Sequence, residues 1–143
     1  MPGSGMKAAF GRIPALEIFG EDYPTRHGTS VRDYIHVLDP ADAHAMALER
    51  IARRGGQLIL DRGLGVGSTV NEVVLATGRA LGRSVPAQPA ERRAGDPPAI
   101  WADATLAERT PGWRAHRGLA QIVERAARWH AAEPDGLPKT LAT

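Results

Sequence analysis

The shortage of strand-forming segments is the feature of this 143-residue sequence that most limits its fold. Residues 16–19 alternate between apolar and polar, residues 31–37 hold β-branched and aromatic side chains, and residues 57–61 form a brief apolar run. Residues 84–88 predict only a weak strand, since Pro86 confines such a segment to the edge of a sheet. These strands are too few and too short to complete a sheet, so several elements are expected to lack partners.

Helical segments lie between the expected strands. Asp39 and Pro40 suit an N-cap and a first helical position, and Gly55 and Gly56 provide the end of that helix. Its apolar face consists of Ala43, Met46, Ala47 and Ile51. The mixture predicts an α/β class.

Three further helices are expected towards the carboxyl terminus. Thr69 and Glu72 have the spacing of a capping box, which predicts a helix from there to about Leu81, closed by Gly82. A short helix is expected from Asp103, and an amphipathic one over residues 119–129. The first fifteen residues hold little pattern, and the polar end of the chain is expected to be frayed.

Composition excludes several classes of function. The sequence is 43% hydrophobic and 24% charged, as expected of a globular protein without a membrane-spanning segment. It has no cysteine and no apolar leader, which predicts a cytoplasmic protein with neither disulfides nor thiolate metal sites. Its five histidines share no metal-ligand spacing, so no metal is expected. The arginine pairs are too short and scattered to predict nucleic-acid binding.

A glycine loop at residues 63–67 follows the apolar run of residues 57–61 and precedes the capping box. This order is typical of a dinucleotide-binding turn, but Ser68 stands where the third glycine of that fingerprint is required. A tight turn between a strand and a helix is therefore the preferred interpretation, with phosphate binding as the alternative.

Two arginine-bearing segments are the strongest candidates for binding an anion. Arg32 precedes Asp33, and Arg93 lies three residues before Asp96 across Gly95. The planar guanidinium group suits bidentate contact with phosphate oxygens, and an aspartate beside it can accept a bond from a ribose hydroxyl. From the residues alone, ordinary solvated or locally paired arginines remain the alternative.

Three stretches together resemble the UDP-glucose 4-epimerases, in the extended short-chain dehydrogenase/reductase group. They are LEIFGEDYPTRHGTSVRDYIHVLDPADAHAMALE (16–49), GLGVGSTVNEVV (63–74) and RRAGDPPAIWADATLAE (92–108). The resemblance covers residues 6–137 in the family's own order, and only the last two-fifths of a family member. It implies a partial fold: a substrate-binding lobe plus the last helix and strand of an otherwise missing Rossmann sheet.

The resemblance also implies roles for individual residues in binding a UDP-sugar. Phe19 matches the residue that packs beside the uracil, and Glu17 the position that contacts the base through its backbone. Arg32 and Arg93 match arginines that bind the diphosphate, and Asp96 matches an acid that binds the ribose.

Two departures from the family pattern affect what this chain is expected to do. Ile100 matches a position on the wall of the sugar pocket, where many bacterial members have an aromatic residue, so N-acetylated sugars become acceptable. Asp61 and Arg62 replace the usual Asn-Leu before the glycine loop, which weakens packing there.

The chemistry of the family requires NAD on an amino-terminal Rossmann domain and a Tyr-x-x-x-Lys pair. Neither Tyr23 nor Tyr34 has a lysine four residues on, so this chain has no catalytic residue, is expected to bind no NAD itself, and is expected to be inactive alone. The resemblance implies an amino-terminal remnant (1–15), a UDP-sugar-binding region (16–137) and a tail (138–143), with a separate amino-terminal half as a candidate partner. The alternatives are a non-catalytic nucleotide-sugar-binding module, a non-functional remnant, and another sugar-nucleotide epimerase or dehydratase.

Overall fold

The computed structural model describes residues 2–110, 112–134 and 136, and the expected tail at residues 138–143 lies outside these described residues. Helices and short strands are interspersed along the chain, in agreement with the α/β prediction. The helices are α1 (Pro2–Ala9), α2 (Leu38–Arg54), α3 (Val70–Leu81), α4 (Thr105–Arg109) and α5 (Leu119–Ala132). The strands are β1 (Leu16–Phe19), β2 (Val31–Arg32), β3 (Ser68–Thr69), β4 (Ala87–Ala90) and β5 (Ala99–Ile100).

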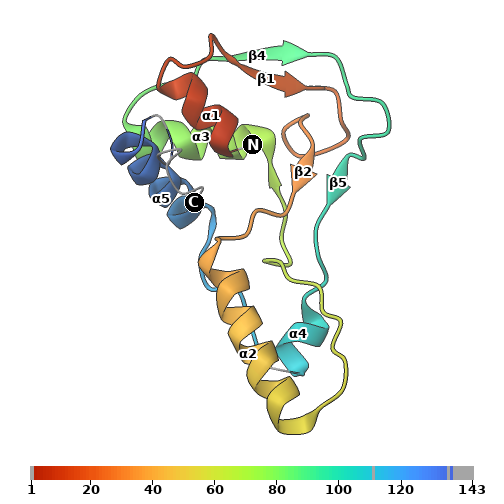
Figure 1. Ribbon diagram of the computed structural model, residues 1–143. Helices are drawn as coiled ribbons and strands as arrows, with labels where there is room; N and C mark the ends of the chain where they lie inside the picture. Colours follow the sequence, from red (N-terminus) through yellow and green to blue (C-terminus); the bar gives the residue numbers. More distant parts are fainter. Residues whose placement is uncertain (1, 111, 135, 137–143) are drawn as a thin grey trace, which may run out of the picture.

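The strands form two small sheets in the upper part of the molecule (Figure 1). One is the parallel pair β1–β4, and the other has the order β3-β2-β5, in which β2 pairs antiparallel with β3 and parallel with β5. Pro89 is tolerated in β4 because that strand has only one neighbour, which confirms the expected edge position although the strand begins later than predicted.

Helices α1, α3 and α5 pack together beside the sheets, whereas α2 and α4 extend below them (Figure 1). The upper helices enclose Met6, Val123 and Ala127, all nearly inaccessible to solvent. A separate lower core joins Ala43 of α2 to Ala104, Ala107 and Trp113.

Local signals in the sequence account for α3. Thr69 accepts a hydrogen bond from the Glu72 amide, the Glu72 carboxylate accepts one from the Thr69 amide, and Gly82 closes the helix with φ 63°. The capping-box prediction is confirmed, as are the end of α2 at Gly55 and the existence of α4 and α5.

Three expectations about elements are wrong. Residues 2–9 form a helix that packs on α3 and α5, so the first fifteen residues are not without pattern. Asp39 does not cap α2, which begins at Leu38, because its buried carboxylate instead accepts bonds from the backbone and guanidinium of Arg117. No strand forms at residues 57–61, because the described residues offer that segment no partner strand, and Leu60 packs on the lower core.

Candidate functional site

A cavity of about 170 Å³ opens where β1, β2 and the loop after β4 meet. Its walls come from segments far apart in the sequence, which the two small sheets bring together. The lining residues are Phe19, Ser30, Arg32, Tyr34, Val70, Arg93 and Asp96. Four of the six predicted binding residues thus line one cavity: Phe19, Arg32, Arg93 and Asp96.

Arg32 is held in place by the loop that carries Asp96. Its Nη2 donates to Asp96 Oδ1 at 2.7 Å, and its Nη1 donates to the carbonyl oxygens of Val31 at 2.7 Å and Pro97 at 3.0 Å. The two side chains are 23% and 34% exposed, so this pair is only partly screened by water. Arg32 therefore faces the cavity in a fixed orientation, with part of its fork engaged by the protein.

Arg93 stands in a different environment from Arg32. Its guanidinium carbon lies 3.8 Å from the centroid of the Phe19 ring, within the range of a cation–π contact. Within the described part of the chain it forms no ion pair. Its donors are free to bind an anion, whereas the neighbouring Arg92 is engaged by Asp22 at 2.6 Å.

Glu17 lies beside this cavity and not in it. It lines a larger hollow of about 570 Å³ that shares Phe19 and Arg93 with the first cavity and also includes Gln88. Glu17 and Gln88 are register partners in the parallel pair β1–β4. The backbone of β1 therefore borders both hollows.

Ile100 is the one predicted residue that lines neither of these hollows. It pairs with Arg32 in the β2–β5 register, and its side chain is 53% exposed. Ile100 is therefore adjacent to the site through the sheet, although it contributes to neither hollow.

Tyr34, Ser30 and Val70 line the cavity but were not among the predicted residues. Period-two alternation along the extended segment that contains β2 puts residues 30, 32 and 34 on one face, so the spacing around Arg32 could have identified two of them. The Tyr34 hydroxyl is buried without a hydrogen-bond partner among the described residues. Burial raises the pKa of Tyr34, with an opposing effect from the charge of Arg32, so this hydroxyl stays protonated at neutral pH.

The glycine loop does not have the geometry of a phosphate cradle. A Cβ on Gly63 would lie 2.1 Å from Asp33 Oδ2, and one on Gly67 would lie 2.2 Å from Val31 Cγ1. Asp33 also accepts bonds from the amides of Leu64 at 3.1 Å and Ala102 at 3.2 Å. These glycines allow close packing of the loop on β2 and the residue after it. The loop leads into β3 and α3, but the described residues directly before it form no strand, so the expected turn between a strand and a helix is wrong in its first part.

Other classes of site find little support in this part of the chain. The described residues include no cluster of three or more His, Asp or Glu side chains that could hold a metal ion. None of the described helices is long and apolar enough to cross a membrane.

Comparison with known proteins gives a consistent set of relatives, although no family model matches. The chain is 44% identical over 132 residues to a UDP-glucose 4-epimerase from Yersinia pestis, covering 92% of this chain and 39% of the relative. A UDP-glucose 4-epimerase structure from Stenotrophomonas maltophila, with bound NAD and formylated UDP-arabinopyranose, superposes with a TM-score of 0.90 at 38% identity, over 93% of this chain and 40% of that one.

A third relative widens the range of sugars. The UDP-Glc/GlcNAc 4-epimerase from Campylobacter jejuni matches with a TM-score of 0.83 at 32% identity, over 92% of this chain and 40% of that one. The chain thus spans about two-fifths of the length of the relatives it matches.

Proposed function

We propose that this chain, which belongs to the UDP-glucose 4-epimerase family and corresponds to the carboxyl-terminal part of its members, supplies the UDP-sugar-binding residues of such an enzyme. The single observation that supports this best is the gathering of Phe19, Arg32, Arg93 and Asp96 around one cavity. The proposed UDP-sugar-binding region is 16–137, and the reaction it serves is the interconversion of UDP-glucose and UDP-galactose in the cytoplasm.

In this proposal each residue contributes one contact. Phe19 provides an apolar face for the uracil, Glu17 its backbone for the base edge, and Arg93 bidentate donors for the diphosphate. Arg32 adds a second positive charge. Asp96 accepts a hydrogen bond from a ribose hydroxyl through its Oδ2, since the ion pair with Arg32 uses Oδ1.

Ile100 takes part in the proposal as a determinant of sugar size. Its exposed side chain lies on the sheet next to Arg32, and an aliphatic residue there leaves more room than an aromatic one. N-acetylated UDP-sugars are therefore proposed as substrates beside UDP-glucose and UDP-galactose.

Calorimetry with UDP tests the proposed binding site. The chain alone is expected to bind UDP with high-micromolar affinity, more weakly as the salt concentration rises. Arg93→Ala is expected to weaken binding by about tenfold, the loss typical of one charge-assisted contact. Arg92→Ala is the matched control, because Arg92 is engaged by Asp22 and lines neither hollow. Equal affinities for the wild type and Arg93→Ala would refute the assignment.

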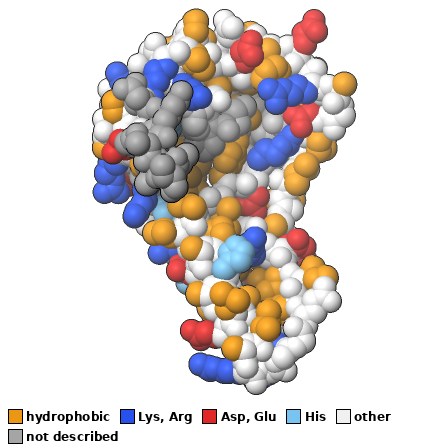
Figure 2. Space-filling model, viewed as in Figure 1, with side chains coloured by type: hydrophobic (Ala, Val, Ile, Leu, Met, Phe, Trp, Pro, Cys, Tyr) orange, Lys and Arg blue, Asp and Glu red, His pale blue; other side chains and the backbone are white. Residues whose placement is uncertain are grey.

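Catalysis requires a Tyr/Lys pair and bound NAD, and in this proposal both belong to a part of the enzyme outside this chain. No Tyr-x-x-x-Lys pair occurs in the sequence, and Ser68 stands where the dinucleotide-binding fingerprint requires its third glycine. We propose that hydride and proton transfer rest on a Rossmann half that binds NAD, and that this half covers the exposed apolar side chains of Leu48, Ile51 and Ile59. Figure 2 shows hydrophobic side chains gathered over the lower part of the molecule, where α2 lies.

A further inference from the structure

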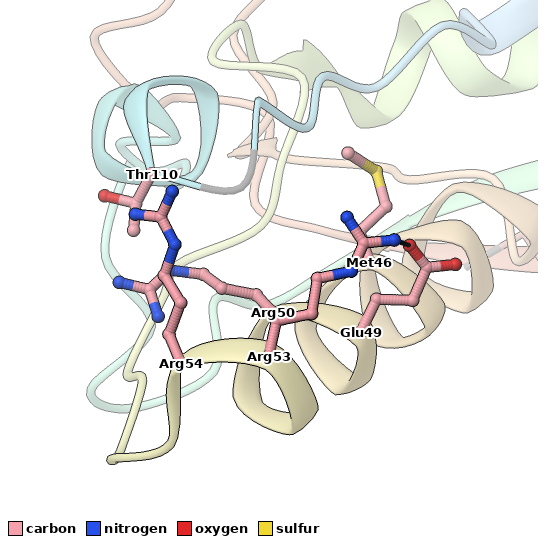
Figure 3. A pocket seen from close by; sticks show the side chains of 6 residues that line it. All are labelled: Met46, Glu49, Arg50, Arg53, Arg54 and Thr110. Carbon is pink, nitrogen blue, oxygen red and sulfur yellow. Dashed lines mark ion pairs between the residues drawn. The ribbon is translucent and has the colours of Figure 1, made fainter.

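A further cavity, of about 220 Å³, lies at the carboxyl-terminal end of α2, against the end of α4 (Figure 3). It is remote from the nucleotide site, because α2 extends away from the two sheets (Figure 1). Its lining combines three arginines with a hydroxyl, a carboxylate and one apolar side chain: Arg50, Arg53, Arg54, Thr110, Glu49 and Met46.

Arg50 differs from the other partly buried arginines. Three arginines of the described residues are partly buried: Arg32, Arg50 and Arg117. Arg32 is paired with Asp96, and Arg117 with Asp39 and Asp42. Arg50 has neither an ion pair nor a hydrogen bond to its guanidinium within the described residues. A partly desolvated cation without a counter-charge is costly, so its environment favours an anion.

Arg54 adds a second unpaired charge to the same side of the helix. Positions 50 and 54 are one turn apart, so the two side chains are neighbours on the helix surface. In Figure 3 both extend towards Thr110, whereas Arg53 turns back to Glu49, with which it forms an ion pair at 3.7 Å. The pair Arg53–Glu49 is neutral overall, and the cavity retains two positive charges.

We propose that this cavity binds a phosphate dianion, as free phosphate or as the terminal group of a phosphate monoester. Two guanidinium forks match the geometry and the charge of phosphate oxygens, and the Thr110 hydroxyl can donate a further bond. The cavity holds several times the volume of about 30 Å³ that one water occupies, which leaves room for the group and part of an ester. The carbonyl end of α2 disfavours an anion, and the two arginines offset it.

Nuclear magnetic resonance titration of the chain with inorganic phosphate, at constant ionic strength set with chloride, tests the proposal. The amide signals of residues 50, 54 and 110 are expected to shift in a saturable way. Arg50→Gln and Arg54→Gln are each expected to weaken this binding by about tenfold, the effect of losing one bidentate contact. Arg125→Gln is the matched control, because Arg125 is an exposed arginine of α5 that does not line the cavity.

Further titrations distinguish free phosphate from a phosphate monoester, and this cavity from the nucleotide site. A sugar phosphate monoester that binds more tightly than inorganic phosphate would identify an ester as the ligand, and equal affinities would identify the free ion. Arg93→Gln is expected to leave these shifts unchanged, so a failure of the nucleotide site is distinguishable from a failure here. Linear shifts without saturation, or equal affinity in Arg50→Gln, Arg54→Gln and Arg125→Gln, would overturn the proposal and leave the arginines as partners of the helix dipole only.

Discussion

At the scale of single residues, the carboxylate of Glu72 fixes how α3 begins. Glu72 accepts a bond from the Thr69 amide and pairs with Arg26, whose guanidinium also donates to the Gly67 carbonyl. The bond from Arg26 is the main cause that lowers the pKa of Glu72 from 4.5 to about 2. One residue thus joins a helix start to two loops.

Glu72→Gln is expected to make the chain less stable at neutral pH but not at low pH. The pKa of Glu72 is lower in the folded than in the unfolded chain, so its contribution is complete above about pH 4.5 and is lost as the pH falls towards 2. Because Gln keeps the capping bond and Arg26 is half exposed, the loss at pH 7 should be about 1 kcal/mol. Urea unfolding of both proteins from pH 7 to pH 2 measures it. A difference that does not shrink with falling pH would contradict the assignment.

Asp39 has a carboxylate that is fully buried and depends on Arg117. Arg117→Ala should leave this charge without its main partner, and the melting temperature should fall by roughly 5 °C or more in a chain of this size. Arg114→Ala is the matched control, because it removes only the exposed pair with Glu108. Thermal unfolding followed by circular dichroism compares them, and equal losses would show that the Asp39 pair is not special.

Local signals in the sequence predicted α3 well, whereas the fate of residues 57–61 and of Asp39 depended on distant partners. The capping box of Thr69 and Glu72 and the glycine end at Gly82 specify α3 by themselves. The run of residues 57–61 has strand composition, but a strand forms only where another offers hydrogen bonds. Asp39 has the position of an N-cap, and only the fold reveals that Arg117 competes for its carboxylate.

The same reasoning applies to the candidate site. The resemblance identified Arg32, Arg93, Asp96 and Phe19, which the fold brings together around one cavity, but it gave no signal for the unpaired hydroxyl of Tyr34. Nor could the sequence foresee that Arg32 and Asp96 bind each other.

Ile59 lies in the segment 57–61, which was expected to form a strand and does not. Its side chain is 78% exposed in a segment without ladder hydrogen bonds. Ile59→Lys should therefore change the free energy of unfolding by less than about 0.5 kcal/mol, while it reduces self-association through the apolar surface. Leu60→Ala is the matched control, because Leu60 packs on the lower core and its loss should destabilise the chain. Sedimentation velocity and urea unfolding measure the two effects. Unchanged self-association would contradict this role of Ile59.

At the scale of the whole molecule, binding and chemistry are expected to separate. The pure chain should not interconvert UDP-glucose and UDP-galactose, with or without added NAD, because its sequence has no Tyr-x-x-x-Lys pair to remove the sugar hydroxyl proton. A coupled assay for UDP-glucose formation tests this. Turnover by the pure chain would refute the division of labour, whereas turnover only after addition of a Rossmann half would support it.

The bond between Arg32 and Asp96 spans 64 residues of sequence, and the register partners Glu17 and Gln88 of the β1–β4 pair are even further apart along the chain. Contacts of such long sequence separation require large loops to close before they contribute, and proteins rich in them fold slowly. The helix α3 can form early from its own capping residues, whereas the cavity requires β1 to pair with β4 and β2 to pair with β5. We therefore expect the binding site to assemble later than α3 during folding.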